Sequence, residues 1–154
     1  MINIRKYVKS DSKALWDIYY NTIHSVNSSD YSQEQIEAWA PSNISIDIWH
    51  QKMVSISPFI AEINGVIVGY TDLQSDGLLD HFFCHHQYQG VGVGRALMNH
   101  IFDCAEARGI SRLYSEVSVT ARPFYERLGF KVVREQLIEV RGQKLRNFVM
   151  DKYL

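Results

Sequence analysis

The chain has 154 residues, of which 46% are hydrophobic, 12% aromatic and 21% charged, a composition that is neither disordered nor fibrous. A chain of this length buries about 70% of its unfolded surface, so residues 1–154 are expected to form one domain. Sixteen Lys and Arg against seventeen Asp and Glu leave a formal net charge of -1. This balance gives no electrostatic reason to expect nucleic acid or an anionic membrane as the main partner.

The segments that direct a protein to a membrane or a compartment are not apparent. The N-terminus has no apolar core of a signal peptide, and no stretch approaches 18 consecutive apolar residues. The two cysteines, Cys84 and Cys104, are too few for a disulfide framework. We therefore expect a cytoplasmic protein in a reducing compartment.

Hydrophobic periodicity and turn residues predict elements in the order β-α-α-β-β-β-α-β-α-β-β. One or two further helical turns are expected at 46–54. The clearest turn signal is Asn64-Gly65, which favours a hairpin. The expected strands are 2–8, 59–63, 66–71, 78–84, 113–118, 130–134 and 144–152, and the expected helices are 14–26, 32–39, 92–108 and 122–128. A meander followed by a strand–helix–strand unit predicts an α/β (α+β) fold, a central mixed sheet of about seven strands flanked by helices.

The glycine-rich loop before the 92–108 helix carries the most specific functional signal. Its three glycines, Gly90, Gly92 and Gly94, let the backbone approach a phosphate, and unpaired N–H groups at the start of the helix point into the loop. The alternative is a tight strand-to-helix turn without a ligand, which does not require three glycines in five residues. The loop therefore predicts a cradle for a pyrophosphate.

Two common nucleotide motifs do not fit this loop. A Walker loop needs Lys-Ser or Lys-Thr after the last glycine, where this chain has Arg95-Ala96. A dinucleotide fingerprint needs G-x-G-x-x-G, and Arg95 stands at its last position when the count starts from Gly90. The roughly sixty residues after the loop are also too few for a six-stranded doubly wound sheet.

The loop fits a third pattern, Q/R-x-x-G-x-G/A, and a second run, Ala-Arg-Pro-Phe-Tyr-Glu-Arg-Leu-Gly-Phe at 121–130, follows about thirty residues later. With these two motifs the chain resembles the GCN5-related N-acetyltransferase family over nearly its whole length. The resemblance implies acetyl-CoA as cosubstrate. It also implies a cofactor-binding set from the strand end and the loop: Phe83, Cys84, Gln89, Gly90, Val91, Gly92, Val93, Gly94, Arg95 and Ala96.

Acetyl transfer to an amine needs a deprotonated nucleophile and a proton or other stabilisation for the departing thiolate. The resemblance implies that Tyr125 is the general acid, and the alternative is a core aromatic packed beside Phe124. The resemblance also implies a role for Asp80, which stands at the strand position of a Glu general base in the histone-acetylating branch of the family, although Asp80 equally fits a solvated carboxylate after the Asp76-Gly77 turn. Glu116, on the next strand, is a weaker candidate for the same role.

Other residues carry weaker signals. Ser118, or Thr120, stands where many relatives carry an Asn that orients the cofactor. The histidines near Cys84 do not complete a tetrahedral metal set, so no metal is expected. Trp39 and Trp49 fit either an acceptor pocket or the packing of a helix on the sheet.

Three functions compete at this point. The leading hypothesis is an acetyl-CoA-dependent N-acetyltransferase acting on a small-molecule amine or a protein amino group by direct attack in a ternary complex. A CoA-binding or sensing module without catalysis would use the same glycine loop, and a dimerisation scaffold would bind no CoA. A homodimer is compatible with all three.

Overall fold

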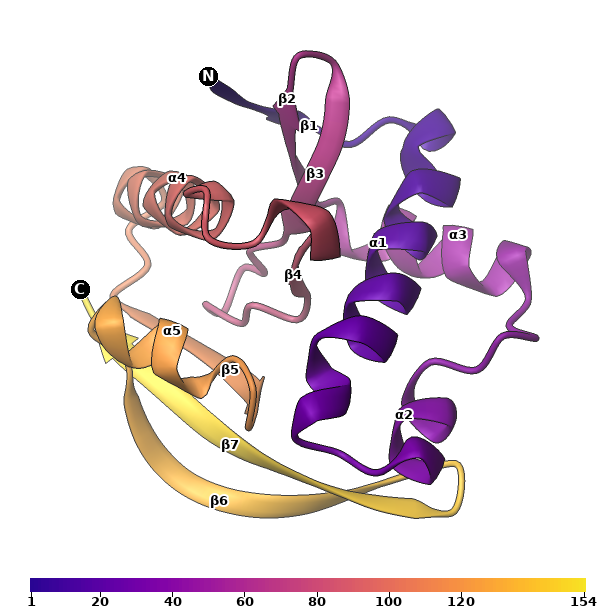
Figure 1. Ribbon diagram of the computed structural model, residues 1–154. Coiled ribbons are helices and arrows are strands. Elements are labelled where there is room, and N and C mark those ends of the chain that lie inside the picture. Colours follow the sequence, from indigo (N-terminus) through magenta and orange to yellow (C-terminus); the bar gives the residue numbers. More distant parts are fainter.

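The computed structural model describes all residues 1–154, and it arranges seven strands in two antiparallel sheets. The first sheet has the order β1-β2-β3-β4 and the second β5-β7-β6 (Figure 1). The strands are β1 Ile2–Lys6, β2 Phe59–Ile63, β3 Val66–Thr71, β4 Phe82–Cys84, β5 Arg112–Ser118, β6 Lys131–Val140 and β7 Gln143–Tyr153. The α+β class and the number of strands are those predicted from the sequence, and the order of elements differs only in that the one or two turns expected at 46–54 form a full helix over Ile46–Ile56.

Five α-helices and three short 3-10 turns complete the chain. They are α1 Ser12–Ser25, α2 Gln33–Trp39, α3 Ile46–Ile56, α4 Val93–Ala107 and α5 Arg122–Arg127, with turns at Lys9–Asp11, Asn27–Ser29 and His86–Tyr88. The start of α2 is fixed by a capping box, in which Ser32 Oγ accepts from Gln35 N–H and Gln35 Oε1 accepts from Ser32 N–H. None of the helices combines the length and the apolar character that crossing a membrane requires.

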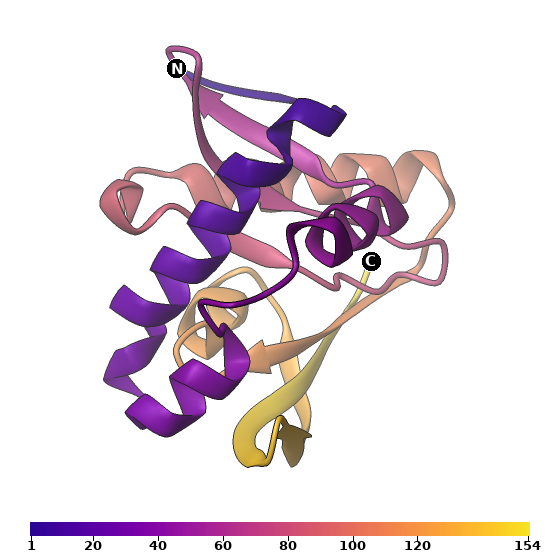
Figure 2. The same ribbon diagram turned by 90° about the vertical axis from the view of Figure 1, so that its right-hand side faces the viewer.

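The two faces of the first sheet are covered by different helices. Ile60 and Tyr70 face α1 and α3, whereas Ala61 and Val68 face α4. Figure 1 shows α4 on one side of this sheet and α1 with α3 on the other. In the view of Figure 2, α1 runs from the first sheet toward α2 and the β6–β7 hairpin. This arrangement places the end of α1 above the region where the two sheets meet.

The expected parallel pairing of the fourth and fifth strands is reduced to one bridge, between Leu78 and Tyr114. The sequence predicted a continuous strand over 78–84, but β4 begins only at Phe82 and pairs with β3 alone. Residues 79–81 are irregular: the Leu79 N–H still donates to Tyr114 O on β5, but side chains bond to Leu79 O and to both backbone groups of His81. The one mixed sheet that was expected is therefore divided, and β4 and β5 diverge beyond the bridge.

The β6–β7 hairpin is much longer than predicted. Strand β6 runs to Val140 instead of ending near Arg134, with a bulge between Val132 and Arg134. The hairpin turn uses Arg141 (φ 45°) and Gly142 (φ 83°), two positive φ values that match the twist of the flanking strands. The turn at Asn64-Gly65 has the same character and was predicted from the sequence. The long hairpin packs on α2, and its Leu145 shares a buried cluster with Ile23 of α1 and Ile36 of α2.

Candidate active site

A cavity of about 670 Å³ lies where β4 and β5 diverge. Pockets of this size bind cofactors and other small ligands. Residues of β4, the glycine loop, β5 and α5 line it, and so do Thr22 and Asn27 from the end of α1 and the turn that follows. The two sequence motifs, at 89–96 and 121–130, therefore face the same space.

The glycine loop presents backbone to this cavity. Gly90 has a φ of 73° and Gly92 a φ of 93°, a region that side-chain-bearing residues avoid. Gly92 is the N-cap of α4, and no side chain caps the helix there. The N–H groups of residues 93–95 therefore have no partner within the helix and carry its positive end. The Ala96 N–H, which was expected to bind the same anion, already donates to Gly92 O at 3.0 Å.

Gly94 joins the two motifs by close packing. A Cβ at this position would lie 2.8 Å from Phe124 Cε1 and 2.9 Å from Phe124 Cζ. These distances are too short for real carbon contacts, so the ring of Phe124 needs a glycine beneath it. The start of α4 and the short helix α5 are thus in direct contact, and Tyr125 follows Phe124 into the cavity.

Gln89 fixes the loop to the end of β4. Its Nε2 donates to Cys84 O at 2.9 Å, and Thr22 Oγ1 donates to the same carbonyl at 2.8 Å. Burial raises the pKa of the Cys84 thiol to about 12, so this cysteine remains protonated at neutral pH. Through its hydrogen bond to Cys84 O, the side chain of Gln89 positions the loop. The edge of β4 that does not face β3 has no strand partner, and Phe83 and Cys84 line the cavity there.

Tyr125 is almost completely buried, with 3% of its surface exposed, and it lines the cavity. Its ring packs edge-on against Phe130, with centroids 5.0 Å apart, and against Phe82 at 5.9 Å. Burial raises the pKa of Tyr125, while a hydroxyl interaction with Ser115 acts in the opposite direction. The phenol is therefore protonated at neutral pH, as a proton donor must be.

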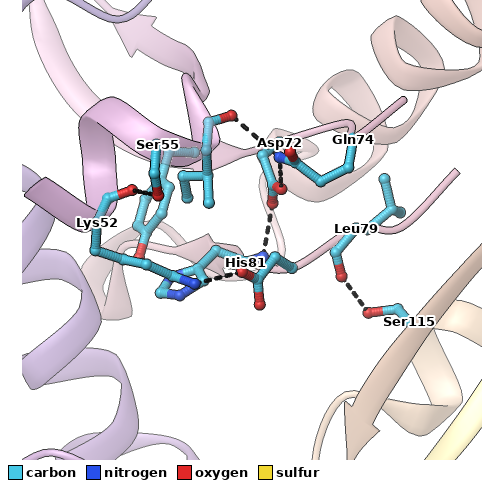
Figure 3. A network of polar contacts seen from close by, with 10 residues as sticks. Lys52, Ser55, Asp72, Gln74, Leu79, His81 and Ser115 are labelled. Carbon is cyan, nitrogen blue, oxygen red and sulfur yellow. Dashed lines mark hydrogen bonds and ion pairs between the residues drawn. The ribbon is translucent and has the colours of Figure 1, made fainter. Parts of the chain in front are cut away.

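A buried polar network holds residues 79–81 in place (Figure 3). Asp72 is fully buried and accepts hydrogen bonds from the His81 N–H at 2.7 Å and from Gln74 Nε2 at 2.6 Å. Ser115 Oγ on β5 donates to Leu79 O at 2.7 Å. Burial raises the pKa of Asp72 to about 6. The segment that carries Asp80 is thus tied to both sheets, which explains why it needs no strand ladder.

The two candidate carboxylates, Asp80 and Glu116, both line the cavity, from opposite sides of the split between the sheets. They differ in their surroundings. Asp80 Oδ2 forms an ion pair with Lys52 Nζ at 2.6 Å, whereas Glu116 forms no salt bridge. Asp80 was expected on a regular strand face, and the structure instead places it in the irregular segment before β4.

Three polar side chains gather at the end of β5. Ser118 Oγ accepts from the Ala121 N–H at 3.0 Å and from Asn27 Nδ2 at 3.3 Å. Thr120 Oγ1 is buried without a hydrogen-bond partner, and it lines the same cavity. Asn27 was not singled out from the sequence, because it lies 91 residues before Ser118 in a polar break that resembles an ordinary loop.

A second cavity of about 310 Å³ adjoins the first. The two share five lining residues: Trp39, Asp80, Phe83, Glu116 and Ser118. The inner face of the β6–β7 hairpin and the side chain of Tyr19 form its far walls. Both carboxylates therefore stand at the junction of two cavities. Of the two tryptophans that the sequence singled out, only Trp39 lines the cavities, since Trp49 is buried and donates from Nε1 to Ser12 O at 2.9 Å.

The histidines around β4 do not assemble a metal site. No group of three or more His, Cys, Asp or Glu side chains has the arrangement needed to hold a metal ion. His85 and His86 stack with ring centroids 4.7 Å apart. His81 instead lies in the wall of the second cavity, where Tyr70 OH is 2.9 Å from its Nδ1 and burial lowers its pKa to about 4.

Comparison with known proteins shows the family to which this chain belongs. The family model of the acetyltransferase (GNAT) domain matches residues 27–152. The N-acetyltransferase YafP of Escherichia coli K12, itself uncharacterized, is 33% identical over 149 residues, which are 97% of this chain and 94% of that protein.

Solved structures agree with this match. A GCN5-related N-acetyltransferase from Rhodopseudomonas palustris superposes with a TM-score of 0.94 and 28% identity, covering 99% of this chain and 95% of the other. The PaiA N-acetyltransferase of Thermoplasma acidophilum, solved in complex with coenzyme A, superposes with a TM-score of 0.79 and 19% identity, covering 100% and 99%.

Proposed function

Because this chain belongs to the acetyltransferase (GNAT) family, we propose that residues 1–154 form one N-acetyltransferase domain, which moves the acetyl group of acetyl-CoA to an amine by direct attack in a ternary complex. The observation that carries this proposal is the junction of the two cavities at Asp80 and Glu116. One cavity has the glycine loop at its edge and the other is free for an acceptor. A module that only binds CoA would have no use for the second cavity or for carboxylates between the two.

The first cavity fits acetyl-CoA, whose thioester supplies an activated acetyl group. The free N–H groups of residues 93–95 and the exposed loop backbone suit a pyrophosphate, and Arg95 and Arg127 line the same cavity with positive charge. The buried, unpartnered Thr120 Oγ1 offers a hydrogen bond deeper in the cavity. The edge of β4 at Phe83 and Cys84 and the side chain of Ser118 complete the proposed binding set.

Tyr125 would protonate the thiolate that leaves when the acetyl group is transferred. Burial raises its pKa, so the phenol carries its proton at neutral pH, and its packing between Phe82 and Phe130 holds the ring in one orientation. A positioned general acid of this kind contributes roughly 10²–10⁴-fold to a rate. The hydroxyl, and not the ring, would carry this effect.

The carboxylates at the junction would bind the amine substrate. An ammonium group is attracted to both, and it must lose a proton before it can attack. We propose that Glu116 accepts this proton, because the ion pair with Lys52 already neutralises Asp80, whereas Glu116 has no cation of its own. Asp80 would then orient the amine, and the network through Asp72 would keep it in place.

The experiment that tests this proposal is an acetylation assay with a broad panel of amines. The protein is incubated with acetyl-CoA, release of free thiol is followed, and mass spectrometry identifies the acetylated acceptor. Amine-dependent thiol release supports the enzyme. Binding of acetyl-CoA without turnover on any amine would favour a CoA-binding module.

We further propose a reducing location, the cytoplasm, because Cys84 and Cys104 are both free thiols.

A further inference from the structure

The walls of the second cavity are mainly apolar and close together. Its volume, about 310 Å³, lies at the lower end of the range for ligand pockets, so it holds a molecule of few heavy atoms rather than an extended chain. The rings of Tyr19 and Phe83 meet edge-on at 4.9 Å, and Tyr19 stacks on His81 at 5.4 Å. Leu145 and Ile138 of the hairpin face them from the other side. Such a wall suits a flat or branched apolar body.

One buried polar group in this wall has no partner within the protein. Asn147 of β7 is 8% exposed and lines the cavity, and its Oδ1 makes no hydrogen bond. Gln136, directly across on β6, has a buried Nε2 that is also without a partner. An unmade hydrogen bond of a buried group costs about 1–3 kcal/mol. Gln136 does not line the cavity, whereas Asn147 does, so a ligand hydroxyl that donates to Asn147 Oδ1 would satisfy the group that faces the cavity.

The arginines at the second cavity already have partners: Arg141, whose charge acts on Tyr19, donates from Nη1 to Ala38 O at 2.8 Å and does not line the cavity. Arg146 is the one Lys or Arg among its lining residues, but its guanidinium pairs with Glu135 and lies over Phe148 at 5.1 Å, away from Asn147 on the alternate strand face. His81 is neutral because burial lowers its pKa to about 4. An acceptor with a carboxylate would therefore meet no unpaired lysine or arginine among the lining residues, and it would lie next to Glu116, which has no cation of its own. A free amino acid is disfavoured for this reason.

A polyamine is disfavoured for a different reason. The junction contributes two carboxylates, and Lys52 already neutralises that of Asp80. Glu116 can compensate one ammonium group, whereas further ammonium groups of the same acceptor would lie against apolar walls. Burying a charge without a partner is costly.

From size, wall, charge and the unpartnered amide, we infer that the acceptor is a small primary amine with an apolar, ring-sized body and a hydroxyl or similar group that bonds to Asn147. This inference rests on the proposed function, since it assumes acetyl transfer at the junction. The amine would lie at Glu116, the body against Tyr19 and Phe83, and the hydroxyl at the hairpin.

Four probes test the ranking that this inference requires. Phenethylamine has the apolar body, and tyramine adds a hydroxyl to it. Phenylalanine adds a carboxylate to the phenethylamine skeleton, and spermidine replaces the body with charges. We expect kcat/KM with acetyl-CoA to be about tenfold higher for tyramine than for phenethylamine, the effect of one hydrogen bond that relieves a buried group. Phenylalanine and spermidine should both be at least tenfold poorer than phenethylamine.

The variant Asn147→Leu tests the hydroxyl contact. Leucine has a similar shape and removes an unsatisfied buried amide, so the fold should be as stable as the wild type. The tyramine preference should disappear, through a higher KM for tyramine, while phenethylamine changes by less than about threefold. Asn99→Leu, an exposed substitution on α4, is the matched control and should keep the preference.

Three results would overturn the inference. The first is a higher kcat/KM for phenylalanine or spermidine than for phenethylamine. The second is an unchanged tyramine preference in Asn147→Leu, and the third is a loss of stability in that variant, which would mean that Asn147 and Gln136 bond to one another. Acetylation of phenylalanine or spermidine alone would refute only the acceptor class. If no amine of the broad panel caused thiol release, the proposed function would be refuted as well.

Discussion

The two cavities that meet at Asp80 and Glu116 are built in different ways. The larger one depends on backbone: two glycines with positive φ, free helix N–H groups and a glycine packed under Phe124. The smaller one depends on side chains from α1, β4, β5 and the β6–β7 hairpin, which are far apart in the sequence. Backbone features suit a ligand that is the same for every member of the family, whereas side chains can change with the acceptor.

This comparison predicts that binding and chemistry can be separated by mutation. Changes in the glycine loop should lower affinity for acetyl-CoA, and changes at the junction should lower turnover with affinity intact. The variants below test this separation, from the largest expected effect to the smallest.

Tyr125→Phe should have the largest effect. It keeps the ring packing against Phe82 and Phe130 and removes only the proposed proton donor. Turnover should fall roughly 10²–10⁴-fold while the Kd for acetyl-CoA changes little, the pattern of an interaction made mainly in the transition state. Steady-state kinetics and calorimetric titration measure both. Tyr153→Phe, at an exposed tyrosine, is the control. Near-normal turnover in Tyr125→Phe would leave the residue a packing aromatic.

Glu116→Gln should lower turnover by roughly 10²-fold at pH 7, because the amine loses its proton acceptor. The loss should shrink as pH rises, since more of the amine is then already deprotonated. Asp80→Asn should lower the rate less, because Lys52 neutralises this carboxylate in the wild type. Rate profiles from pH 6 to 9 measure the difference. A larger effect at Asp80, greatest at low pH, would move the role of general base to that residue.

Gly92→Val should weaken acetyl-CoA binding without a special effect on chemistry. At 100 times its Kd, acetyl-CoA stabilises the wild type by about 2.7 kcal/mol, and the melting temperature should rise by several degrees. Valine disfavours the φ of 93° and adds a side chain at the loop position proposed to approach the pyrophosphate, so this shift should be lost. Gly109→Val, at φ 70° in open space beyond α4, imposes similar strain and should keep the shift. An intact shift in Gly92→Val would contradict the backbone cradle.

Asp72→Asn should change the pH dependence of stability by a smaller amount. Burial raises the pKa of Asp72 from 3.8 to about 6, so its contribution is present below pH 3.8 and is lost as pH rises through 6. The pKa of His81 is lowered from 6.5 to about 4, so its contribution is present above pH 6.5 and is lost as pH falls through 4. The two contributions oppose each other in the wild type.

When Asp72 is replaced by Asn, the opposing contribution of His81 to the pH dependence of stability should become visible. Acidification from pH 6.5 to 4 should then destabilise Asp72→Asn by on the order of 2 kcal/mol more than the wild type. Urea unfolding at several pH values measures this difference, with the exposed substitution Asp17→Asn as control. Parallel pH profiles of Asp72→Asn and wild type would show that Asp72 is ionised at neutral pH without cost.

The sequence predicted the larger cavity, which is built from backbone, far better than the smaller one, which is built from side chains. Its signals are local: glycines before a helix, a second motif about thirty residues later, and an Asn-Gly turn that sets a hairpin register. Both strands of the last hairpin were predicted, but the extension of β6 to a tight turn at Arg141-Gly142 was not, because the turn lacks Asn-Gly and because a bulge at Val132 interrupts the alternation of β6. Without that hairpin the second cavity has no wall.

The irregular segment before β4 escaped prediction for a similar reason. Residues 78–84 alternate like a strand, and the features that break the strand are distant: Asp72 bonds to the His81 N–H, and Ser115 bonds to Leu79 O. Asn27 meets Ser118 across 91 positions of sequence. Contacts of this kind depend on tertiary packing, which a local pattern does not encode.

The most direct test of the central claim is a calorimetric titration of acetyl-CoA into Glu116→Gln, run beside the wild type and followed by turnover of the same samples with an amine acceptor. If the glycine loop binds and the junction reacts, the two proteins should have Kd values within about twofold, while kcat of the variant falls roughly 10²-fold. Equal turnover in the two proteins, or a Kd that weakens in parallel with kcat, would contradict the division of labour between the two cavities.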